Sequence, residues 1–470
     1  MVTLGIDSGT QGTKAILFDL KRSRIVGSGS VPHRLLRGAD SSTKEQDPAE
    51  WIHALRISVG QALASAPARI HRRIAGIAVS GQQHGFVALD REDQVLRPAK
   101  LWCDTATAAE AAWLIRKNGG LRHLIRRTGN GLPAGFTASK ILWFKRHEPR
   151  KYARLAQVLL PHDYLNFWLT GNKTMESGDA SGTGFFDVRR RTWSHPVMQS
   201  IDRRLPAMLP PILAPDETAG SLQANAARAL GLPTGVPVAP GGGDNMMGAI
   251  GTGNVTGGVV TLSLGTSGTI YAYSDHPIID PLGEVAAFCD STGGWLPLVC
   301  TMNVTIATET MGRALGLSHA QWTHLAEKVP QGSGGLQFVP YLQGERTPNL
   351  PHATAAYLGL NLANFSPGHL ARATLEGISG GLNYGLQRLR SLGLRPQEIR
   401  LTGGGAQNPL WRRILAQTLE VPVVKVATKE GAALGAALQA AWVVSGGGRK
   451  GLRKLTERHV RLDFSTRCRP

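Results

Sequence analysis

The chain has 470 residues, of which 42% are hydrophobic and 18% charged, and this composition excludes a disordered polymer because it supplies enough apolar surface to build cores. At roughly 100–200 residues per domain, the length predicts about two to four domains. The formal net charge of +19 raises the question of an anionic partner, but outside the basic segment 449–469 the Lys and Arg residues are scattered, as on a solvated basic surface.

Cysteine usage and hydropathy indicate the compartment. The cysteines at 103, 289, 300 and 468 form no Cys-x-x-Cys pair, which argues against a disulfide scaffold or zinc site and fits a reducing cytoplasm. The chain contains no run of about 18 consecutive strongly apolar residues, so no membrane span is predicted. No helix-turn-helix pattern or aromatic-interleaved basic stripe occurs. We therefore expect a cytoplasmic protein with no membrane partner and no specific nucleic-acid partner, and weak non-specific attraction to RNA stays open.

In chain order, the first predicted element is a β-hairpin. Residues 2–19 contain two β-prone runs around a turn, 7–14, that is rich in glycine and hydroxyl groups. The pattern returns at 258–273, where two β-prone runs flank Gly265-Thr266. This recurrence predicts two halves with related architecture, and a chance recurrence in a glycine-rich chain is the alternative.

Between and beyond the hairpins, apolar strands alternate with helical patterns, which predicts an α/β fold. A buried strand is expected at 74–80 and another at 399–402, just before the turn Gly403-Gly404-Gly405. The last helix, 431–442, consists largely of Ala, Gly and Leu and should pack closely against its neighbour. Further helices are predicted at 139–147, 163–169, 367–392 and 409–419.

The glycine-rich turns suggest a nucleotide, but the common phosphate motifs are absent. The chain has no Gly-x4-Gly-Lys-Ser/Thr motif and no strand-linked Gly-x-Gly-x-x-Gly motif. Backbone amides at the hairpin tips can still cradle phosphate oxygens, and the carboxylate of Asp7 can organise Mg²⁺ through water. For each turn taken alone, an ordinary hairpin or helix-start turn is the alternative.

Taken together, Asp7-Ser8-Gly9-Thr10, the Gly265-Thr266 hairpin and the turn at 403–405 resemble the ATPase fold of actin, hexokinase and heat-shock chaperones. Residues 135–143, and residues 357–360 with 369–376, are similar to two signatures of the FGGY carbohydrate kinases. The resemblance covers about residues 2–445. It implies an α/β fold of two actin/hexokinase-like (ribonuclease H-like) domains with an interdomain cleft.

Within that family, residues 80–85, 101–104 and 240–245 are similar to the sugar-site segments of the xylulokinases. This similarity implies ATP-dependent phosphorylation of D-xylulose. Cys103 and Thr105-Ala106 depart from the common bacterial pattern, so a kinase acting on ribulose, a polyol or gluconate is the alternative. An actin- or chaperone-like protein driven by ATP is a more remote one.

The resemblance also implies roles for individual residues. Asp244 is expected to be the general base and Asp7 the catalytic carboxylate that faces Mg²⁺; a helix N-cap after a glycine turn is the structural alternative for Asp244. The cofactors implied are ATP and Mg²⁺, and the partners are ATP and a small sugar. Residues expected to bind the sugar are Gln83, His84, Asp104 and Asn245. Residues expected to bind the nucleotide are Thr10, Gln11, Gly12, Lys14, Gly265, Thr266, Gly404, Gly405 and Asn408.

The predicted domain organisation follows from these assignments. Residues 1–246 should hold the sugar site and the base, residues 247–448 the nucleotide site, and residues 449–470 should form a basic surface extension. The sequence does not reveal the oligomeric state, and a homodimer stays open.

Overall fold

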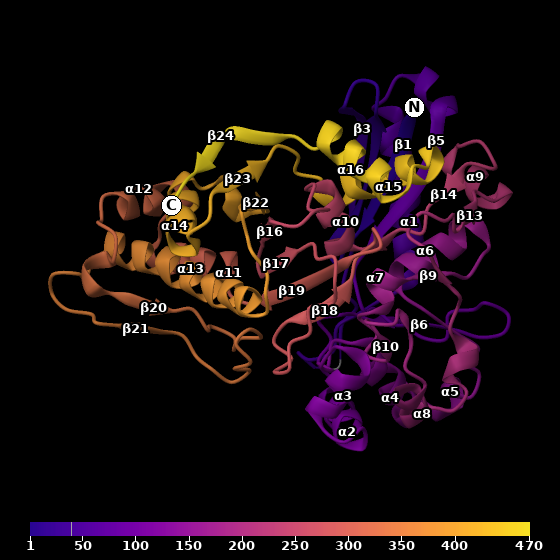
Figure 1. The fold of residues 1–470 in the computed structure, drawn as a ribbon, viewed down its shortest axis with the longest axis horizontal. Helices are drawn as coiled ribbons and strands as arrows, with labels where there is room; N and C mark the ends of the chain where they lie inside the picture. Colours follow the sequence, from indigo (N-terminus) through magenta and orange to yellow (C-terminus); the bar gives the residue numbers. More distant parts are fainter. Residues whose placement is uncertain (39) are drawn as a thin grey trace.

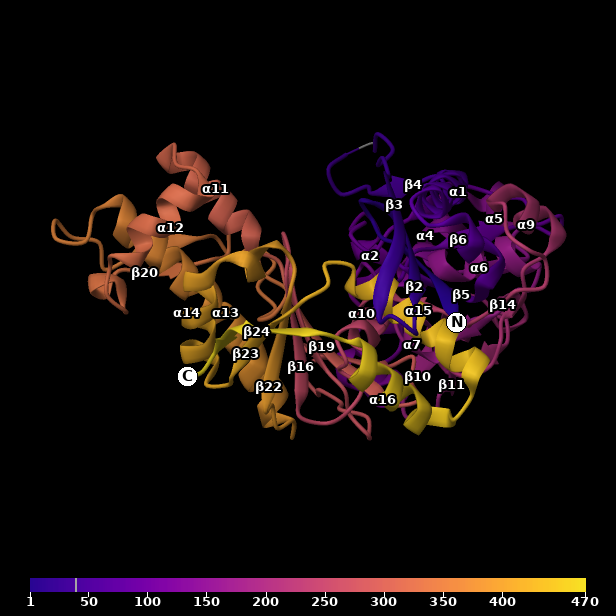
Figure 2. The ribbon, with the colours of Figure 1, turned by 90° about the horizontal axis from the view of Figure 1, so that it is seen from above.

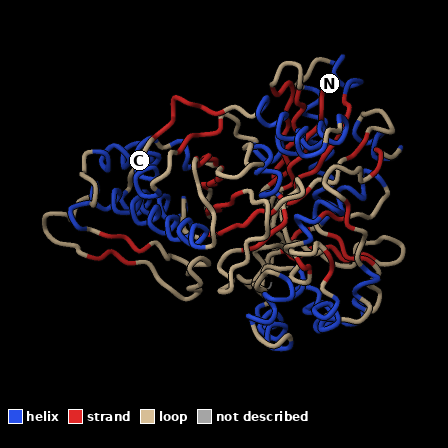
Figure 3. Tube along the Cα trace, in the orientation of Figure 1, coloured by secondary structure: helices blue, strands red, loops and turns tan. Residues whose placement is uncertain are grey.

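Two mixed β-sheets, one in each lobe, organise the computed structural model, which describes residues 1–38 and 40–470 (Figures 1 and 2). Strands run through the middle of each lobe and helices flank them (Figure 3). In spatial order the first sheet contains β13 (Gly220–Ser221), β14 (Pro237–Val238), β5 (Ile74–Gly81), β1 (Val2–Ser8), β2 (Gly12–Asp19) and β3 (Arg24–Pro32), with β15 (Gly242–Gly243) also paired to β5. The second contains β18 (Ala286–Cys289), β19 (Trp295–Thr301), β17 (Gly268–Ala272), β16 (Val259–Leu264), β22 (Glu398–Thr402), β23 (Val423–Val426) and β24 (Leu462–Cys468).

The two sheets repeat one pairing pattern. In the first, β2 is antiparallel to β1 and β3, β5 is parallel to β1, and β14 is parallel to β5. In the second, β17 is antiparallel to β16 and β19, β22 is parallel to β16, and β23 is parallel to β22. The two lobes therefore share an architecture, as the recurring hairpin predicts.

Helices cover these sheets and form the outer parts of both lobes. Those of the first half are α1 (Pro48–Ala64), α2 (Ala108–Lys117), α3 (Leu121–Thr128), α4 (Thr137–His147), α5 (Pro149–Tyr152), α6 (Pro161–Thr170), α7 (Ser177–Ala180), α8 (His195–Ile201), α9 (Ala224–Leu230) and α10 (Asp244–Gly251). Those of the second half are α11 (Thr305–Leu315), α12 (His319–Glu327), α13 (Pro367–Ser391), α14 (Pro409–Leu419), α15 (Gly431–Ser445) and α16 (Gly448–His459).

Five small two-stranded pairs complete the fold. They are β4 (Glu45–Gln46) with β7 (Ala99–Lys100), β6 (Val87–Leu89) with β8 (Gln157–Leu159), β9 (Met175–Glu176) with β12 (Ile212–Leu213), β10 (Phe186–Asp187) with β11 (Thr192–Trp193), and β20 (Gln337–Val339) with β21 (Ala356–Leu358). In the part of the chain described above, no helix is long and apolar enough to cross a membrane.

Helix α15 crosses from one half of the sequence to the other lobe. It follows β23 of the second sheet, yet it packs against β1 and β5 of the first sheet and against α10 (Figure 1). Because α1 packs against β2 and β3 while α15 packs against β1, the apolar run of β1 is buried along nearly its whole length. Thr3 Oγ1 donates to the carbonyl of Ala437 at 2.8 Å, which fixes this contact.

Glycines permit the close approach of α10 and α15. A Cβ added at Gly435 would lie 1.8 Å from the carbonyl oxygen of Met247, and one added at Gly251 would lie 1.8 Å from that of Gly431. The two helix backbones therefore touch directly, as the Ala- and Gly-rich sequence of residues 431–442 predicts.

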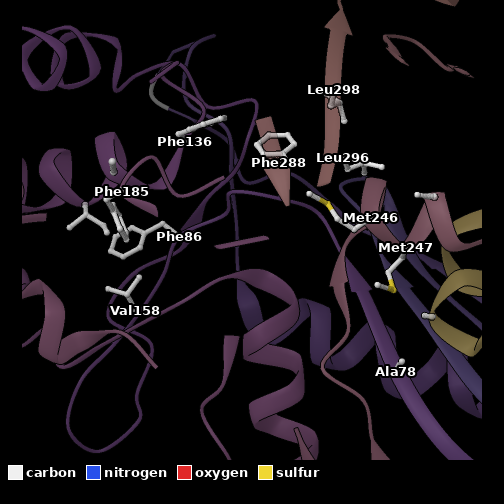
Figure 4. Close-up of a cluster of buried hydrophobic side chains, with 14 of the residues drawn as sticks. Ala78, Phe86, Phe136, Val158, Phe185, Met246, Met247, Phe288, Leu296 and Leu298 are labelled. Carbon is white, nitrogen blue, oxygen red and sulfur yellow. The ribbon is translucent and has the colours of Figure 1, made fainter. Parts of the chain in front are cut away.

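A hydrophobic cluster joins the two lobes. Phe288, on β18, and Leu296, on β19, lie beside Met246 of α10 and near Phe136, which precedes α4 (Figure 4). All four side chains are buried. The sheet of the second lobe thus contributes directly to the core beneath the end of β5.

The segment after residue 448 differs from the predicted surface extension. Residues 448–459 form α16, which buries Leu452 against α15. The last strand, β24, pairs antiparallel with β23 and becomes the edge of the second sheet. The amphipathic pattern of α16 is short and strongly basic. The prediction of a surface extension relied on this charge and overlooked the periodic apolar positions.

Candidate active site

Three chain segments meet at one edge of the first sheet. Because β1 and β5 are parallel, their carboxyl ends lie together, and Ser80 Oγ donates to Asp7 Oδ1 at 2.8 Å. Strand β15 pairs with the end of β5, which brings the next residue, Asp244, to the same edge. The loop that follows β5 carries Gln83 and His84.

Asp244 begins α10, and the preceding Gly243 allows it to approach the loop after β5. A Cβ at Gly243 would lie 2.6 Å from Gln83 Cγ, so a larger residue would push this segment away. Asn245 donates through Nδ2 to Asp244 Oδ1 and to Gln83 Oε1, both at 2.9 Å. The structure therefore brings Gln83, Asp244 and Asn245 together. Gly243, and not Asp244, occupies the N-cap position of α10.

Burial and nearby negative charges raise the pKa values of both carboxyl groups. Burial, with the negative charge of Asp7, raises the pKa of Asp244 to about 7. Burial also raises the pKa of Asp7 to about 6, although the hydrogen bond from Ser80 and the charge of Lys14 oppose this shift. A carboxylate with a pKa near neutrality is suited to accept a proton, and two half-buried carboxylates at one edge of a sheet attract a cation.

His84 is held in a strained backbone conformation with a neutral ring. Its φ is 61°, and its ring lies 4.6 Å from the ring of Phe136 and 5.4 Å from that of Phe288 between centroids. Burial, with the positive charges of Lys140 and Arg346, lowers the pKa of His84 well below its usual value. The ring is therefore neutral near pH 7 and has one donor and one acceptor nitrogen.

Two buried polar atoms beside this cluster have no hydrogen-bond partner among the described residues. They are Gln83 Nε2 and His84 Nδ1. Leaving a buried donor or acceptor unsatisfied costs about 1–3 kcal/mol, so such atoms often face a ligand. Nδ1 faces Gly182, where an added Cβ would lie 2.1 Å from it, whereas the Gln83 amide lies next to Asn245 and Gly243.

Both carboxylate oxygens of Asp104 accept hydrogen bonds from the surrounding chain. The residue is fully buried, and Oδ2 accepts from Lys100 Nζ at 3.0 Å and from the backbone N–H of Lys44 at 2.9 Å. Its other oxygen accepts from the backbone N–H of Ala106 at 3.2 Å. Both carboxylate oxygens are thus used to fix the loop after β7, and a contact with the sugar stays a prediction.

The tip of the β1–β2 hairpin is tied to its surroundings. Thr10 Oγ1 accepts from Trp102 Nε1 at 2.8 Å and donates to Gln82 Oε1 at 3.1 Å, so the tip is joined to the loop that carries Gln83. Lys14 forms a 3.0 Å ion pair with Glu430, which precedes α15. The carbonyl of Gln11 accepts from the N–H of residue 33, and Gly12 lies against Val31, where an added Cβ would be 2.6 Å from the carbonyl oxygen.

The β16–β17 hairpin is the equivalent tip in the second lobe. The carbonyls of Gly265 and Thr266 accept from the N–H groups of Thr305 and Val304, at 3.0 and 3.2 Å. The tip is therefore fixed to the start of α11, which positions its remaining backbone groups.

The turn at residues 403–405 follows β22 and precedes α14. An added Cβ at Gly404 would meet nothing within 4 Å, whereas one at Gly405 would lie 2.8 Å from the ring of Trp411. Asn408 is the N-cap of α14: its Oδ1 accepts from the N–H of Trp411 at 3.1 Å, and its Nδ2 donates to Thr323 at 3.0 Å. Gly404 is thus open to a ligand, while the Asn408 side chain serves the helix start.

Several buried residues that support this site were not among the site residues predicted from the sequence. Lys140 Nζ donates to the carbonyls of His84 and Gly135, at 2.6 and 2.7 Å. Asp179 Oδ1 accepts from the backbone N–H of His84 at 3.4 Å, and its Oδ2 lies 3.0 Å from Nδ1 of His162. Two signals could have found Lys140: it lies within the signature-like segment 135–143, and it is a lysine in the middle of an apolar stretch.

The residues present fit a Mg²⁺ ion that is shared with phosphates. Among the described residues, no group of three or more His, Cys, Asp or Glu side chains gathers to hold a metal. Mg²⁺ commonly uses one or two carboxylates together with substrate phosphates and water. Asp7, half-buried at the same edge of the sheet as Asp244 and with a raised pKa, supplies such a carboxylate.

Comparison with known proteins assigns the class. Residues 2–251 match the model of the N-terminal domain of the FGGY family of carbohydrate kinases, and residues 260–444 match its C-terminal domain. The chain belongs to the FGGY family of carbohydrate kinases. It is therefore a sugar kinase, and the family implies ATP and a sugar as its substrates, as the sequence motifs predict.

Individual relatives are similar along almost the whole chain. The xylulose kinase of Haemophilus influenzae is 42% identical, with 99% of this chain and 95% of that protein covered. The xylulose kinase of Escherichia coli is 36% identical over 88% of this chain and 84% of that protein. The structure of the xylulose kinase of Bifidobacterium adolescentis, 34% identical, superposes with a TM-score of 0.83 and covers 95% of this chain and 93% of that chain. The predicted α/β fold with two actin/hexokinase-like domains is confirmed.

Proposed function

We propose that this kinase transfers the γ-phosphoryl group of ATP to D-xylulose and releases D-xylulose 5-phosphate. The observation that carries the proposal is the pair of hydrogen bonds by which Asn245 joins Asp244 to Gln83, at the edge where Asp7 lies. The relatives named xylulose kinase, at up to 42% identity over the whole chain, support the choice of sugar.

Asp244 is the general base of the proposed reaction. It accepts the proton of the attacking hydroxyl, and its raised pKa, about 7, suits that exchange near neutral pH. Asn245 orients the carboxylate by donating to Oδ1 from its backbone N–H at 2.8 Å and from Nδ2 at 2.9 Å. Gln83 and His84 supply further polar groups for the sugar hydroxyls, and a sugar that leaves them unpaired is disfavoured.

The nucleotide is proposed to lie between the two hairpin tips. Residues 10–14 and Gly265-Thr266 face the phosphates, Gly404 and Gly405 lie along the adenosine, and Asn408 holds that turn through its cap of α14. Asp7 would hold Mg²⁺, which neutralises phosphate charge when it is bound. Lobe closure around both substrates would exclude water, which competes as an acceptor.

Three further features belong to the same proposal. The cytoplasmic location is supported by the four free thiols, which all lie in the described part of the chain. The boundary near residue 246 lies close to the end of the first family match, at residue 251. Homodimerisation is tested directly by measuring the mass of the protein in solution by light scattering.

A coupled assay for ADP release across about a dozen pentuloses, hexonates and polyols tests the substrate. We expect D-xylulose to give the largest kcat/KM with Mg-ATP. A rate at least about tenfold better on ribulose, glycerol or gluconate would contradict the choice of sugar but not the family. ATP turnover that ignores every acceptor would favour an actin- or chaperone-like role instead.

A further inference from the structure

A loop of the second lobe, residues 342–350, is fixed rigidly beside the second hairpin tip. Glu345 is 4% exposed; Oε1 accepts from the N–H of Met302 at 2.7 Å, and Oε2 accepts from Asn303 Nδ2 at 3.1 Å. Glu345 also pairs through its backbone with Leu350, at 2.8 and 3.0 Å. Residues 302–303 lie just before α11, whose first N–H groups bind the tip at Gly265-Thr266.

The next residue, Arg346, extends from this loop toward the first lobe. Its guanidinium carbon lies 5.7 Å from the ring centre of Trp102, the residue that donates to Thr10 at the first hairpin tip. Nη1 also lies 3.8 Å from the sulfur of Cys300. Arg346 is thus a cation from the second lobe that reaches the sugar side of the first.

The electrostatic surroundings place this cation near the reacting groups. Its charge helps to lower the pKa of His84, after burial and Lys140. Burial raises the pKa of Cys300; Arg346 opposes that shift, and the carboxylate of Asp244 adds to it. Both Arg346 and Asp244 therefore act on the same thiol, one from each lobe.

Arg346 lacks the partner that a half-buried arginine usually has. Among the described residues it forms no ion pair with a carboxylate, unlike Arg372 or Arg388 of the same lobe. A ring face and a thiol are weak partners for a guanidinium, whereas its fork of N–H groups matches phosphate oxygens. The resting contacts can therefore be exchanged for an anion at little cost.

We propose that Arg346 is a further catalytic residue, whose guanidinium binds the phosphoryl group during its transfer between the lobes. The proposal rests on the proposed kinase reaction. In that step the bond from the γ-phosphorus to the β–γ bridging oxygen breaks while a bond to the sugar oxygen forms, and the sugar proton passes to Asp244. Arg346 keeps its protons and stabilises the charge spread over the three equatorial oxygens.

The kinetic test compares Arg346→Lys and Arg346→Gln with Arg313→Gln, which changes an exposed arginine of the same lobe. Arginines that stabilise phosphoryl transfer are worth about 10³–10⁵ in kcat, so we expect Arg346→Gln to lower kcat at least about 100-fold, with both KM values changed only a few-fold. Arg346→Lys should show a similarly low kcat, because lysine lacks the forked N–H groups of the guanidinium. Arg313→Gln should behave as wild type. Added guanidinium ion should partly restore the activity of Arg346→Ala.

A measurement without turnover separates folding from chemistry. ADP with aluminium fluoride and the sugar mimics the transferring phosphoryl group and should raise the Tm of the wild type more than ADP alone does. We expect Arg346→Gln to keep the shift with ADP and to lose most of the extra shift with aluminium fluoride. A normal ADP shift demonstrates that the variant is folded; if it is absent, Arg346→Lys carries the same comparison.

Two results would overturn the proposal: a kcat within about fivefold of wild type in Arg346→Gln, or a defect confined to the KM of the sugar. All comparisons use the acceptor that the wild type phosphorylates best. If that acceptor is not D-xylulose, only the proposed choice of sugar is wrong. The role of Arg346 is still decided by the ratio of the kcat of the variant to that of the wild type.

Discussion

Asp244 is the residue at which substitution most directly tests the proposed chemistry. Asp244→Asn keeps the shape of the side chain and an oxygen that can accept from Asn245, but it removes the proton acceptor. General-base catalysis contributes about 10²–10⁴-fold, so we expect kcat to fall by that factor while the KM for ATP changes only a few-fold. Steady-state kinetics at saturating sugar measures this. Retention of more than about a tenth of the wild-type kcat would assign the proton to another acceptor.

Asp7→Asn is the matched comparison, because it changes the neighbouring carboxylate to the same amide. We expect it to alter the dependence of the rate on Mg²⁺ concentration.

The wild-type rate should also rise as pH increases through about 7, since the pKa of Asp244 is raised to about 7 and the base must lose its proton. Because Asp7 and Asp244 interact, the measured pKa belongs to the pair.

The raised pKa of Asp244 has a consequence for stability as well. An acid that is harder to ionise in the folded protein binds more protons there than in the unfolded chain, so its ionisation destabilises the fold. The penalty is complete above a pH of about 7, shrinks as pH falls, and vanishes below the ordinary value of 3.8. At roughly 1.4 kcal/mol per pKa unit, it reaches at most about 4 kcal/mol.

We therefore expect Asp244→Asn to be more stable than wild type at pH 8 without Mg²⁺. The Tm difference should shrink steadily as pH is lowered from 8 to 5. Differential scanning calorimetry of both proteins in the same buffers measures it. A Tm difference that does not depend on pH would mean that folding does not raise the pKa of the Asp244 carboxyl group.

The motifs predicted which polar residues face the site, and this stays a prediction; they did not predict which partners each residue has. Gln83 and Asn245 lie in contact, as two sugar-site segments should. Asp104 belongs to another of the segments that resemble a sugar site, yet its carboxylate accepts from Lys100 Nζ and from the backbone N–H of Lys44. Such pairings depend on loops that meet only in the folded chain, and no local pattern encodes them. The same holds for Arg346, which acts across the two lobes.

At the level of elements, the contact between α10 and α15 depends on two glycines. We expect Gly435→Ala to destabilise the protein strongly, by about 3 kcal/mol or more, because its Cβ would lie 1.8 Å from the Met247 carbonyl oxygen. Gly380→Ala is the matched control: it also lies within a helix, but its Cβ would meet nothing within 4 Å. There alanine should stabilise by up to about 1 kcal/mol. Urea denaturation monitored by circular dichroism compares the two.

Equal effects of the two substitutions would contradict a packing role for Gly435. The sequence predicted a closely packed helix at 431–442, and the structure has it at Gly431–Ser445. It could not predict the partner, because a helix that is apolar all round has no single buried face. Its partners are α10 and the strands β1 and β5 of the first sheet.

At the level of the whole molecule, the last residues connect the lobes. His459 Nδ1 lies 2.8 Å from Ser23 Oγ in the first lobe, and β24 completes the sheet of the second. We expect a chain that ends at Ser445 to have a clearly lower Tm, because it loses β24 and the buried Leu452. A chain that ends at Cys468 keeps both and should match the full-length protein within about 1 °C. Equal Tm values for all three chains would instead support the basic surface extension predicted from the sequence.

The crossing of α15 to the first lobe also determines when that lobe can be finished during synthesis. Strands β1 and β5 leave the ribosome early, but the helix that covers them ends at Ser445. At about 5–20 residues per second, β1 and β5 wait for roughly 20 to 70 seconds with an apolar face uncovered. The nascent N-terminal half is therefore a natural client for chaperones, and expression of that half alone would leave its sheet permanently open on one side.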